Sequence, residues 1–148
     1  MSQAGLEVFD STLQKTHLWL NELEELAHLP DQHTAFKVLR AVLHALRDRL
    51  PVDVAAHLGA QLPMLIRGFF YEGYRPAGKP LRIRSQDEFL EEISAEIIGP
   101  EAVDPLRITH CVFELLNRHL SPGEPVKIRK ILPHELQALW PEPSPVFR

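Results

Sequence analysis

The feature that most constrains the fold is an apolar and proline pattern that occurs twice, in one register and without gaps. A gapless alignment of the sequence with itself that pairs Trp19 with Phe89 also pairs apolar and proline positions along most of the chain. We call this alignment the repeat register. Its further matches are Leu20 with Leu90, Leu23 with Ile93, Pro30 with Pro100, Val42 with Val112, Leu46 with Leu116, Leu50 with Leu120, Leu62-Pro63 with Leu132-Pro133 and Phe70 with Trp140. These positions decide where helices begin and which faces they bury, so the pattern indicates a duplication.

Apolar residues at alternating steps of three and four predict helices in the first copy. The stripe that predicts a helix over residues 6–28 consists of Leu6, Phe9, Leu13, Leu20, Leu23 and Ala27. Asp31 is expected to cap a second helix that ends at Pro51, and a short third helix follows. Pro63 is expected as the first residue of a fourth helix, which ends at Gly73.

Capping signals predict the helix starts of the second copy. Ser85 and Glu88 have the spacing of a capping box, for a helix that ends at Gly99-Pro100. The further expected starts are Asp104-Pro105, a second capping box at Ser121-Pro122-Gly123-Glu124 with proline at the first helical position, and Leu132-Pro133, which opens a last helix ending near Trp140.

Two repeats are too few for an open solenoid, so the copies should pack face to face into one closed helical bundle. The sequence therefore predicts an all-α fold with a single domain over residues 1–140, built from two degenerate repeats of three to four helices. Repeat one covers about 6–74 and repeat two about 85–140, with a basic linker at 75–84. The proline-rich tail 141–148 is expected to be flexible.

Composition excludes several classes of protein. A hydrophobic fraction of 45% with 24% charged residues is typical of a soluble globular chain. Cys111 is the only cysteine, so neither an internal disulfide nor a cysteine-based zinc site can form, and a reducing compartment is favoured. No segment has the pattern of a signal peptide or a membrane span. We therefore expect a cytoplasmic protein with no membrane partner.

The linker concentrates positive charge between two acidic halves. Arg75, Lys79, Arg82 and Arg84 lie within residues 75–84, which contain no acidic residue. The first interpretation is that these side chains pair with acidic helix faces. The second is a contact with an anion or a nucleic acid. Four charges on an otherwise acidic chain make nucleic-acid binding the less favoured interpretation.

Several segments resemble a known family. The runs LHALRDRLP (43–51), AAHLGAQLP (55–63) and RGFFYEGY (67–74) look like the bacterial domain-of-unknown-function family 2267 (DUF2267). The resemblance extends from about Phe9 to Trp140. It implies a small, helical, cytoplasmic protein, and it brings no established activity, cofactor or catalytic residue. The matching segments of the second repeat, LLNRHLS (115–121) and RKILP (129–133), are eroded.

Candidate metal and catalytic motifs are incomplete. Glu25 and His28 have the Glu-x-x-His spacing of di-iron bundles, but the aligned segment of the second repeat supplies no counterpart. His44 and Asp48 form an i,i+4 pair of the kind common on helix surfaces. Cys111 lies in an apolar context and is interpreted as a small core residue. We expect no cofactor, no metal and no catalytic residue; the alternative is a small-molecule or metal-dependent enzyme with its site between the repeats.

The second predicted helix has a basic face that the second repeat does not preserve. This face consists of Lys37, Arg40, His44 and Arg47, and we expect it to lie opposite Glu22, Glu24 and Glu25 of the first helix. The repeat register pairs these four residues with Arg107, His110, Glu114 and Asn117. The basic face is therefore specific to the first repeat.

Residues 67–74 are the most distinctive segment of the chain. They contain four aromatic side chains within six residues, more than one helix face needs for its own core. Gly68 lies inside a helical pattern at a cost of about 1 kcal/mol relative to alanine, which a close backbone approach is expected to offset. Two interpretations stay open: a packing contact that closes the bundle between the repeats, and a groove for a partner helix, a peptide or another subunit.

We expect a non-enzymatic helical module that acts through protein–protein contact or self-association. The expected partner is a second copy of the chain, giving a homodimer, or another helical protein. The candidate binding residues are Arg67, Phe70, Tyr71, Glu72 and Tyr74 of the distinctive segment, Arg47 of the basic face, and Arg82 and Arg84 of the linker.

Overall fold

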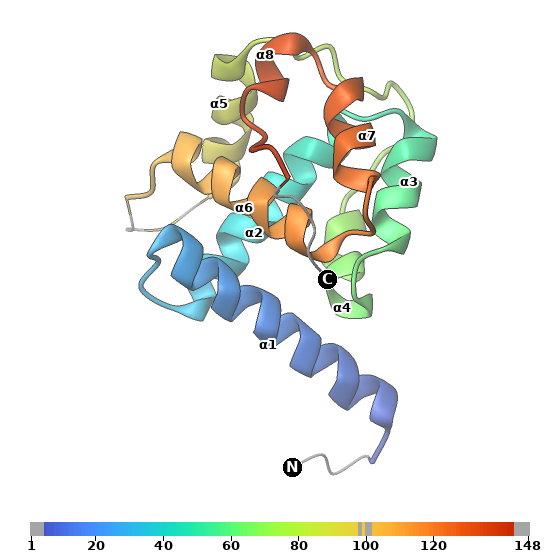
Figure 1. Ribbon diagram of the computed structural model, residues 1–148, viewed down its shortest axis with the longest axis vertical. Coiled ribbons are helices and arrows are strands. Elements are labelled where there is room, and N and C mark those ends of the chain that lie inside the picture. The colour runs from blue at the N-terminus through green and yellow to red at the C-terminus, as the bar shows by residue number, and fades with distance from the viewer. Residues whose placement is uncertain (1–4, 98, 100–101, 144–148) are drawn as a thin grey trace.

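The computed structural model describes residues 5–97, 99 and 102–143, and over these residues the chain forms helices and no strand (Figure 1). In chain order the helices are α1 (Glu7–Ala27), α2 (Gln32–Asp48), α3 (Val52–Ala60), α4 (Met64–Tyr71), α5 (Gln86–Glu96), α6 (Pro105–His119), α7 (Glu124–Ile131) and α8 (His134–Gln137). The predicted all-α class is confirmed. None of the helices in the described ranges is long and apolar enough to cross a membrane.

Side-chain caps begin several helices as the sequence predicts. The Asp31 carboxylate accepts the Thr34 amide at 2.8 Å, and the Ser85 hydroxyl accepts the Glu88 amide at 3.2 Å. The Asp104 carboxylate accepts the amide of Leu106 at 3.1 Å. Each cap satisfies an amide that has no partner within its own helix, which fixes the start of α2, α5 and α6.

The start predicted at Ser121 is wrong. Helix α7 begins at Glu124, and its cap is Gly123 with φ of 91°, without a side-chain cap bond. A helix begun at Pro122 would place Pro125 at its fourth position, where proline lacks the amide needed for the first intrahelical bond to Ser121. Starting at Glu124 moves Pro125 to the second position, where that amide is not needed.

Prolines set two further boundaries that differ from the prediction. Pro63 and Pro133 take the cap position, with ψ of 151° and 154°, instead of the first helical position. Helix α8 contains only four residues, and i→i+3 turns carry the chain on to Trp140. The proline that follows, Pro141, disfavours helical backbone at Trp140, so the helix does not extend through that residue. Helix α5 ends at Glu96; Pro100, where its end was expected, and residues 144–148 of the tail lie outside the described residues.

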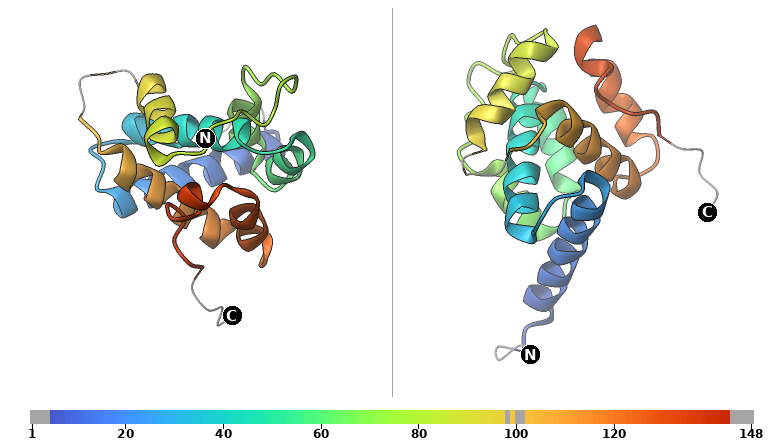
Figure 2. Two further views of the ribbon diagram at one scale, coloured as in Figure 1. Left: turned by 90° about the horizontal axis from the view of Figure 1, so that it is seen from above. Right: turned by 90° about the vertical axis from the view of Figure 1, so that its left-hand side faces the viewer.

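Several helix contacts occur in pairs that are related by exchanging the two halves of the chain, although the contacts of α4 with α2 and α3 have no counterpart of comparable extent among the described residues. Helix α1 packs against α2 and α6, and α5 correspondingly packs against α6 and α2. The contact of α1 with α4 has its counterpart in that of α5 with α8, while α2 and α6 pack against each other at the centre. Figures 1 and 2 show this central pair with the remaining helices around it. Descent of the two halves from one duplicated segment stays a prediction.

Helix α1 differs from its counterpart α5 in length. It has 21 residues against 11, and the first residue of α5, Gln86, corresponds in the repeat register to Thr16, well inside α1. The N-terminal part of α1 projects from the rest of the protein (Figures 1 and 2). The apolar stripe of α1 is therefore buried at Leu20 and Leu23 but exposed at Phe9 and Leu13, in the projecting part. We call residues 6–15 the arm.

The basic linker 75–84 has no regular structure and is attached through its backbone. The Leu81 amide donates to the Asp48 carbonyl at 2.8 Å, and Arg49 donates to the carbonyl of Ile83. Within the described part of the chain, none of the four basic linker residues (Arg75, Lys79, Arg82 and Arg84) forms an ion pair. The interpretation that they pair with acidic helix faces is therefore wrong.

Candidate functional site

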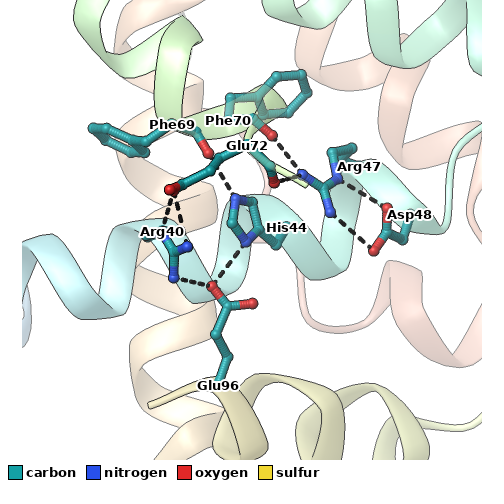
Figure 3. Close-up of polar contacts among 8 residues, drawn as sticks. All are labelled: Arg40, His44, Arg47, Asp48, Phe69, Phe70, Glu72 and Glu96. Carbon is teal, nitrogen blue, oxygen red and sulfur yellow. Dashed lines mark hydrogen bonds and ion pairs between the residues drawn. The ribbon is translucent and has the colours of Figure 1, made fainter. Parts of the chain in front are cut away.

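The basic face of α2 lies against α4 and α5, not against α1 (Figure 3). Arg40 contacts the Glu72 carboxylate at 2.8 Å and the Glu96 carboxylate at 2.9 Å. The prediction that this face meets the acidic residues of α1 is wrong. Glu22, one of those acidic residues, instead pairs with Arg118 and His119 of α6, at 3.1 and 2.8 Å. Helical periodicity in the sequence predicts which residues of α2 share the charged face, but it does not predict which helices pack against that face.

His44 joins the same network from a buried position. Its Nε2 atom lies 2.6 Å from the Phe69 carbonyl oxygen, and its Nδ1 atom lies 2.8 Å from Oε2 of Glu96. Both neighbours are acceptors, so the arrangement is fully satisfied when each ring nitrogen carries a proton. His44 thereby links the last turn of α4 to the end of α5, across the two halves of the chain (Figure 3).

Arg47 is buried and holds the end of α4. Its side chain is 6% exposed, and Nη1 donates to the carbonyl oxygens of Phe70 at 2.8 Å and Glu72 at 2.9 Å. Its Nε atom donates to the Asp48 carboxylate at 2.8 Å. Carbonyls at the end of a helix have no intrahelical partner, so Arg47 supplies the donors that they lack.

Asn117 has the same role in the second half. It is the residue that the repeat register pairs with Arg47, and its Nδ2 atom donates to the Pro141 carbonyl at 3.0 Å. Its Oδ1 atom accepts the indole N–H of Trp140 at 2.7 Å. The second half therefore lacks the charge of Arg47. Asn117 nevertheless makes the corresponding contact, because it binds the segment that follows the fourth helix of the second half.

Arg67 caps the end of α3. Its guanidinium donates to the carbonyl oxygens of Gly59 at 2.9 Å, Ala60 at 3.2 Å and Leu62 at 2.9 Å. Its counterpart in the repeat register, Gln137, donates to the carbonyl of Leu132 at 2.9 Å, which corresponds to the bond that Arg67 makes with Leu62. Arg67 is therefore occupied within the fold.

The two tyrosines of the segment also pack onto the protein. A Cβ atom added to Gly59 would lie 2.7 Å from the Tyr71 hydroxyl oxygen, so Tyr71 lies directly on that glycine. The Tyr74 ring lies beneath the Arg47 guanidinium, 5.2 Å from its centroid. Burial and the nearby Asp48 carboxylate raise the pKa of Tyr74, while Arg47 opposes this shift. Both rings help to bind α4 and the linker to α2 and α3.

The predicted binding residues therefore separate into groups. Arg47 and Phe70 are buried in the fold, and their contact with a partner stays a prediction. Arg67, Tyr71 and Tyr74 make packing contacts within the first half. Glu72 is exposed beside Arg40, while Arg82 and Arg84 lie exposed on the linker, apart from this cluster. The close approach expected at Gly68 is wrong, because a Cβ atom there would have no neighbour within 4 Å.

The open side of Gly68 is part of a groove between α1, α2 and α4. The groove has a volume of about 630 Å³ and is lined by Thr16, Leu20, Gln32, His33, Phe36, Leu65, Gly68, Phe69 and Glu72. The rings of Phe36 and Phe69 meet edge to face, 5.2 Å apart, in its wall. Of the predicted binding residues, Glu72 alone lines it.

The groove continues onto the arm. Phe9 and Leu13 precede Thr16 and Leu20 on the same helical stripe and are 51% and 47% exposed. Leu65 of α4 is 43% exposed, and its amide donates to the Thr12 hydroxyl at 2.9 Å, which fixes α4 to the arm. We call the set Leu6, Phe9, Leu13, Phe36, Leu65 and Phe69 the apolar surface.

One signal in the sequence points to this surface. In the repeat register Phe9 of the arm corresponds to Lys79, so this aromatic residue has no apolar counterpart in the second half. Phe36, Leu65 and Phe69 gave no such signal, because helical periodicity interprets each of them as core. Their partial exposure depends on where α1 lies relative to α4.

Metal-binding and reactive groups are sparse in the described residues. No group of three His, Cys, Asp or Glu side chains among them is placed to hold a metal ion. Cys111 is buried, with its thiol 3.5 Å from the Leu26 carbonyl oxygen, and burial raises its pKa. A thiol in this setting is a core residue and a poor nucleophile.

The fold and the groove define a small all-helical protein with an apolar surface at one end. The chain matches the model of a family described as "Uncharacterized conserved protein (DUF2267)" over residues 16–139, and it belongs to that family. No curated protein matches the chain. The family match begins at Thr16, so it covers the groove and most of both halves but none of the arm.

Proposed function

We propose that the protein is a self-associating helical module, in which two copies pair through the apolar surface. The observation that carries the proposal is the arm, a helical segment whose apolar stripe is about half exposed at Leu6, Phe9 and Leu13. An amphipathic helix normally buries such a stripe, and contiguous exposed apolar surface is typical of interaction sites.

Antiparallel pairing of two α1 helices about a twofold axis at Leu13 would cover this stripe. In that register Leu13 meets Leu13, and Leu6 of each copy lies opposite Leu20, which lines the groove of the other copy. A twofold interface uses the same patch on both copies, so one surface must supply both the arm and its acceptor. Here the arm and the groove are continuous along α1.

Charge complements this arrangement. The arm carries Glu7, Asp10 and Lys15, while His33 lines the groove and His17 lies 2.9 Å from Gln32, another lining residue. In the antiparallel register the acidic end of each arm approaches the N-terminus of α2 in the other copy. That end of a helix favours negative charge. Complementary charge supports this orientation over the parallel one.

Sedimentation of matched leucine variants tests the proposal. Leu13→Glu places a charge in the interface and should convert the dimer to a monomer. Leu18→Glu is the control, because Leu18 is on the same helix, is 57% exposed and lies on another face. Circular dichroism should show unchanged helix content for both variants. A monomeric wild-type protein, or equal dissociation by both variants, would contradict the proposal.

A cross-linking experiment tests the register. In a Cys111→Ala background, Leu13→Cys should form a disulfide between two copies under mild oxidation, because residues on a twofold axis meet their own equivalents. Leu18→Cys should remain reduced under the same conditions. Equal cross-linking at both positions would show random collision instead of a defined interface.

The proposal includes a cytoplasmic location in a bacterium, as the sequence predicts. Cys111 is a free thiol in a buried position, which is compatible with a reducing compartment. The contact pairs related by exchange of the two halves support the predicted duplication.

A further inference from the structure

Helices α3 and α7 border a second cavity, separate from the apolar surface. Its volume is about 300 Å³, and it is lined by Asp53, Val54 and His57 of α3 and by Glu124, Lys127, Ile128 and Ile131 of α7. These two helices occupy corresponding positions in the two halves of the chain. The cavity therefore lies between the halves.

A buried carboxylate faces this cavity. The Glu124 side chain is 7% exposed, whereas its counterpart in the repeat register is Val54. The first half thus shows that an apolar side chain suits this place in the frame. A buried ionised carboxylate costs several kcal/mol unless it is well paired and hydrogen-bonded.

The partners of Glu124 are loosely held. Its Oε1 atom lies 3.3 Å from Nε2 of His57 and 3.8 Å from the Lys127 ammonium nitrogen. Those two side chains are 60% and 70% exposed. Charge-assisted hydrogen bonds in proteins are shorter, about 2.7–2.9 Å, and ion pairs between exposed side chains are weak. The carboxylate therefore keeps acceptor capacity that these neighbours do not use.

We infer that the cavity between α3 and α7 binds a small organic ammonium ion, with its head on Glu124 and its hydrocarbon chain on Val54, Ile128 and Ile131. An ammonium group supplies the short donors that the buried carboxylate lacks. His57 and Lys127 are exposed enough to swing aside. The inference is independent of self-association, because no residue of the apolar surface lines this cavity.

The lining argues against other ligand classes. Two carboxylates, Glu124 and Asp53, outnumber the one ammonium group of Lys127 in the lining, so the cavity does not favour an anion. A neutral apolar molecule would leave Glu124 with only its long contacts to His57 and Lys127. In the described residues Asp53, His57 and Glu124 do not form a group that could hold a metal ion. A cation with an apolar body is the ligand that complements both the Glu124 carboxylate and the apolar side chains of the cavity.

Calorimetric titration with n-butylamine at neutral pH tests the inference, with 1-butanol as the uncharged analogue. Butylamine should bind, and butanol should not. Glu124→Gln should weaken butylamine binding about tenfold or more, the effect of one lost charge-assisted hydrogen bond. Glu88→Gln is the matched control and should bind as wild type, because Glu88 is an exposed residue near the N-terminus of another helix.

Two further measurements keep the test decisive if Glu124→Gln disturbs the fold. Val54→Phe should fill the cavity and abolish binding while circular dichroism remains unchanged. Butylamine should shift the methyl NMR signals of Ile128 and Ile131 in the wild-type protein. Equal binding of butanol and butylamine, unchanged affinity of folded Glu124→Gln, or no binding by the wild-type protein would each overturn the inference.

Discussion

Arg47 donates to the carbonyl oxygen of Phe70 at 2.8 Å, and so a buried guanidinium of α2 closes the last turn of α4. The same atom reaches the Glu72 carbonyl at 2.9 Å, where the chain leaves the helix. Arg47 is 5% exposed, so water does not replace these donors when they are removed. Arg47 therefore attaches α4 to α2 together with His44 and Arg40.

Replacing Arg47 with methionine should lower the free energy of unfolding by about 2–4 kcal/mol, because one buried and one partly buried carbonyl lose a charged donor. Urea denaturation measures the effect. Arg82→Met is the control, since Arg82 is exposed and should change stability by no more than about 0.5 kcal/mol. Equal, small effects of both substitutions would contradict the role assigned to Arg47.

The contact between His44 and Glu96 should be energetically coupled. A double-mutant cycle with His44→Gln and Glu96→Gln is expected to give a coupling energy of at least about 0.5 kcal/mol, because the side chains meet at 2.8 Å and His44 is buried. Additive losses would show that Glu96 only lies near the ring. A second double-mutant cycle, between Arg40 and Glu96, gives the coupling energy of a more exposed donor to the same Glu96 oxygen, for comparison with His44.

Two helical glycines should respond in opposite directions to alanine. Gly68→Ala should raise the free energy of unfolding by about 0.5–1 kcal/mol, because a Cβ atom there has no neighbour within 4 Å. Gly59→Ala should lower it by about 1–3 kcal/mol, because the Cβ atom would lie 2.7 Å from the Tyr71 hydroxyl and 2.9 Å from ring carbons. Thermal or urea denaturation gives both signs.

A second variant isolates the cause at Gly59. In a Tyr71→Ala background the obstructing ring is absent, so Gly59→Ala should become neutral or stabilising. If Gly59→Ala destabilises both backgrounds equally, the contact with Tyr71 is not responsible.

Cys111 should react slowly in the folded protein, because burial raises the pKa of its thiol and the thiolate is the reactive form. A raised folded pKa means that the folded state holds this proton more tightly than the unfolded chain. The corresponding contribution to stability is present below the unfolded pKa and is lost as pH rises through the folded pKa. The rate of Cys111 alkylation by iodoacetamide, followed across the alkaline range with and without urea, measures the reactivity of the thiol. Equal rates in the folded and the unfolded protein would contradict the raised pKa.

Much of the fold follows from local signals. Asp31, Ser85 and Asp104 were identified as caps because their side chains satisfy amides within their own first turns, which needs no knowledge of the rest of the protein. Helical class and order follow from periodicity for the same reason. The predicted start of α7 is wrong because two local signals compete. Ser121 offers a cap, but Pro125 lacks the amide that a helix starting at Pro122 would need, and the second effect prevails.

The candidate site was less accessible to sequence reasoning. Periodicity places Phe70 and Phe69 together as apolar residues, yet Phe70 is fully buried and Phe69 lines the groove. The difference depends on the position of α1 and α2 relative to α4, which is a long-range property. The sequence predicts the basic face as a face, but not its neighbours: α4 comes from the same half, and α5 comes from the crossing of the two halves.

That crossing has a consequence for how the chain could be divided. Helix α1 rests on α6, and α5 rests on α2, so each half completes the surface of the other. Cleaving the linker at Gly78, an exposed turn residue, would leave every helix intact but separate these partners. The two fragments should be poorly ordered alone and should reconstitute the bundle by complementation when mixed, which would make this protein a candidate split reporter.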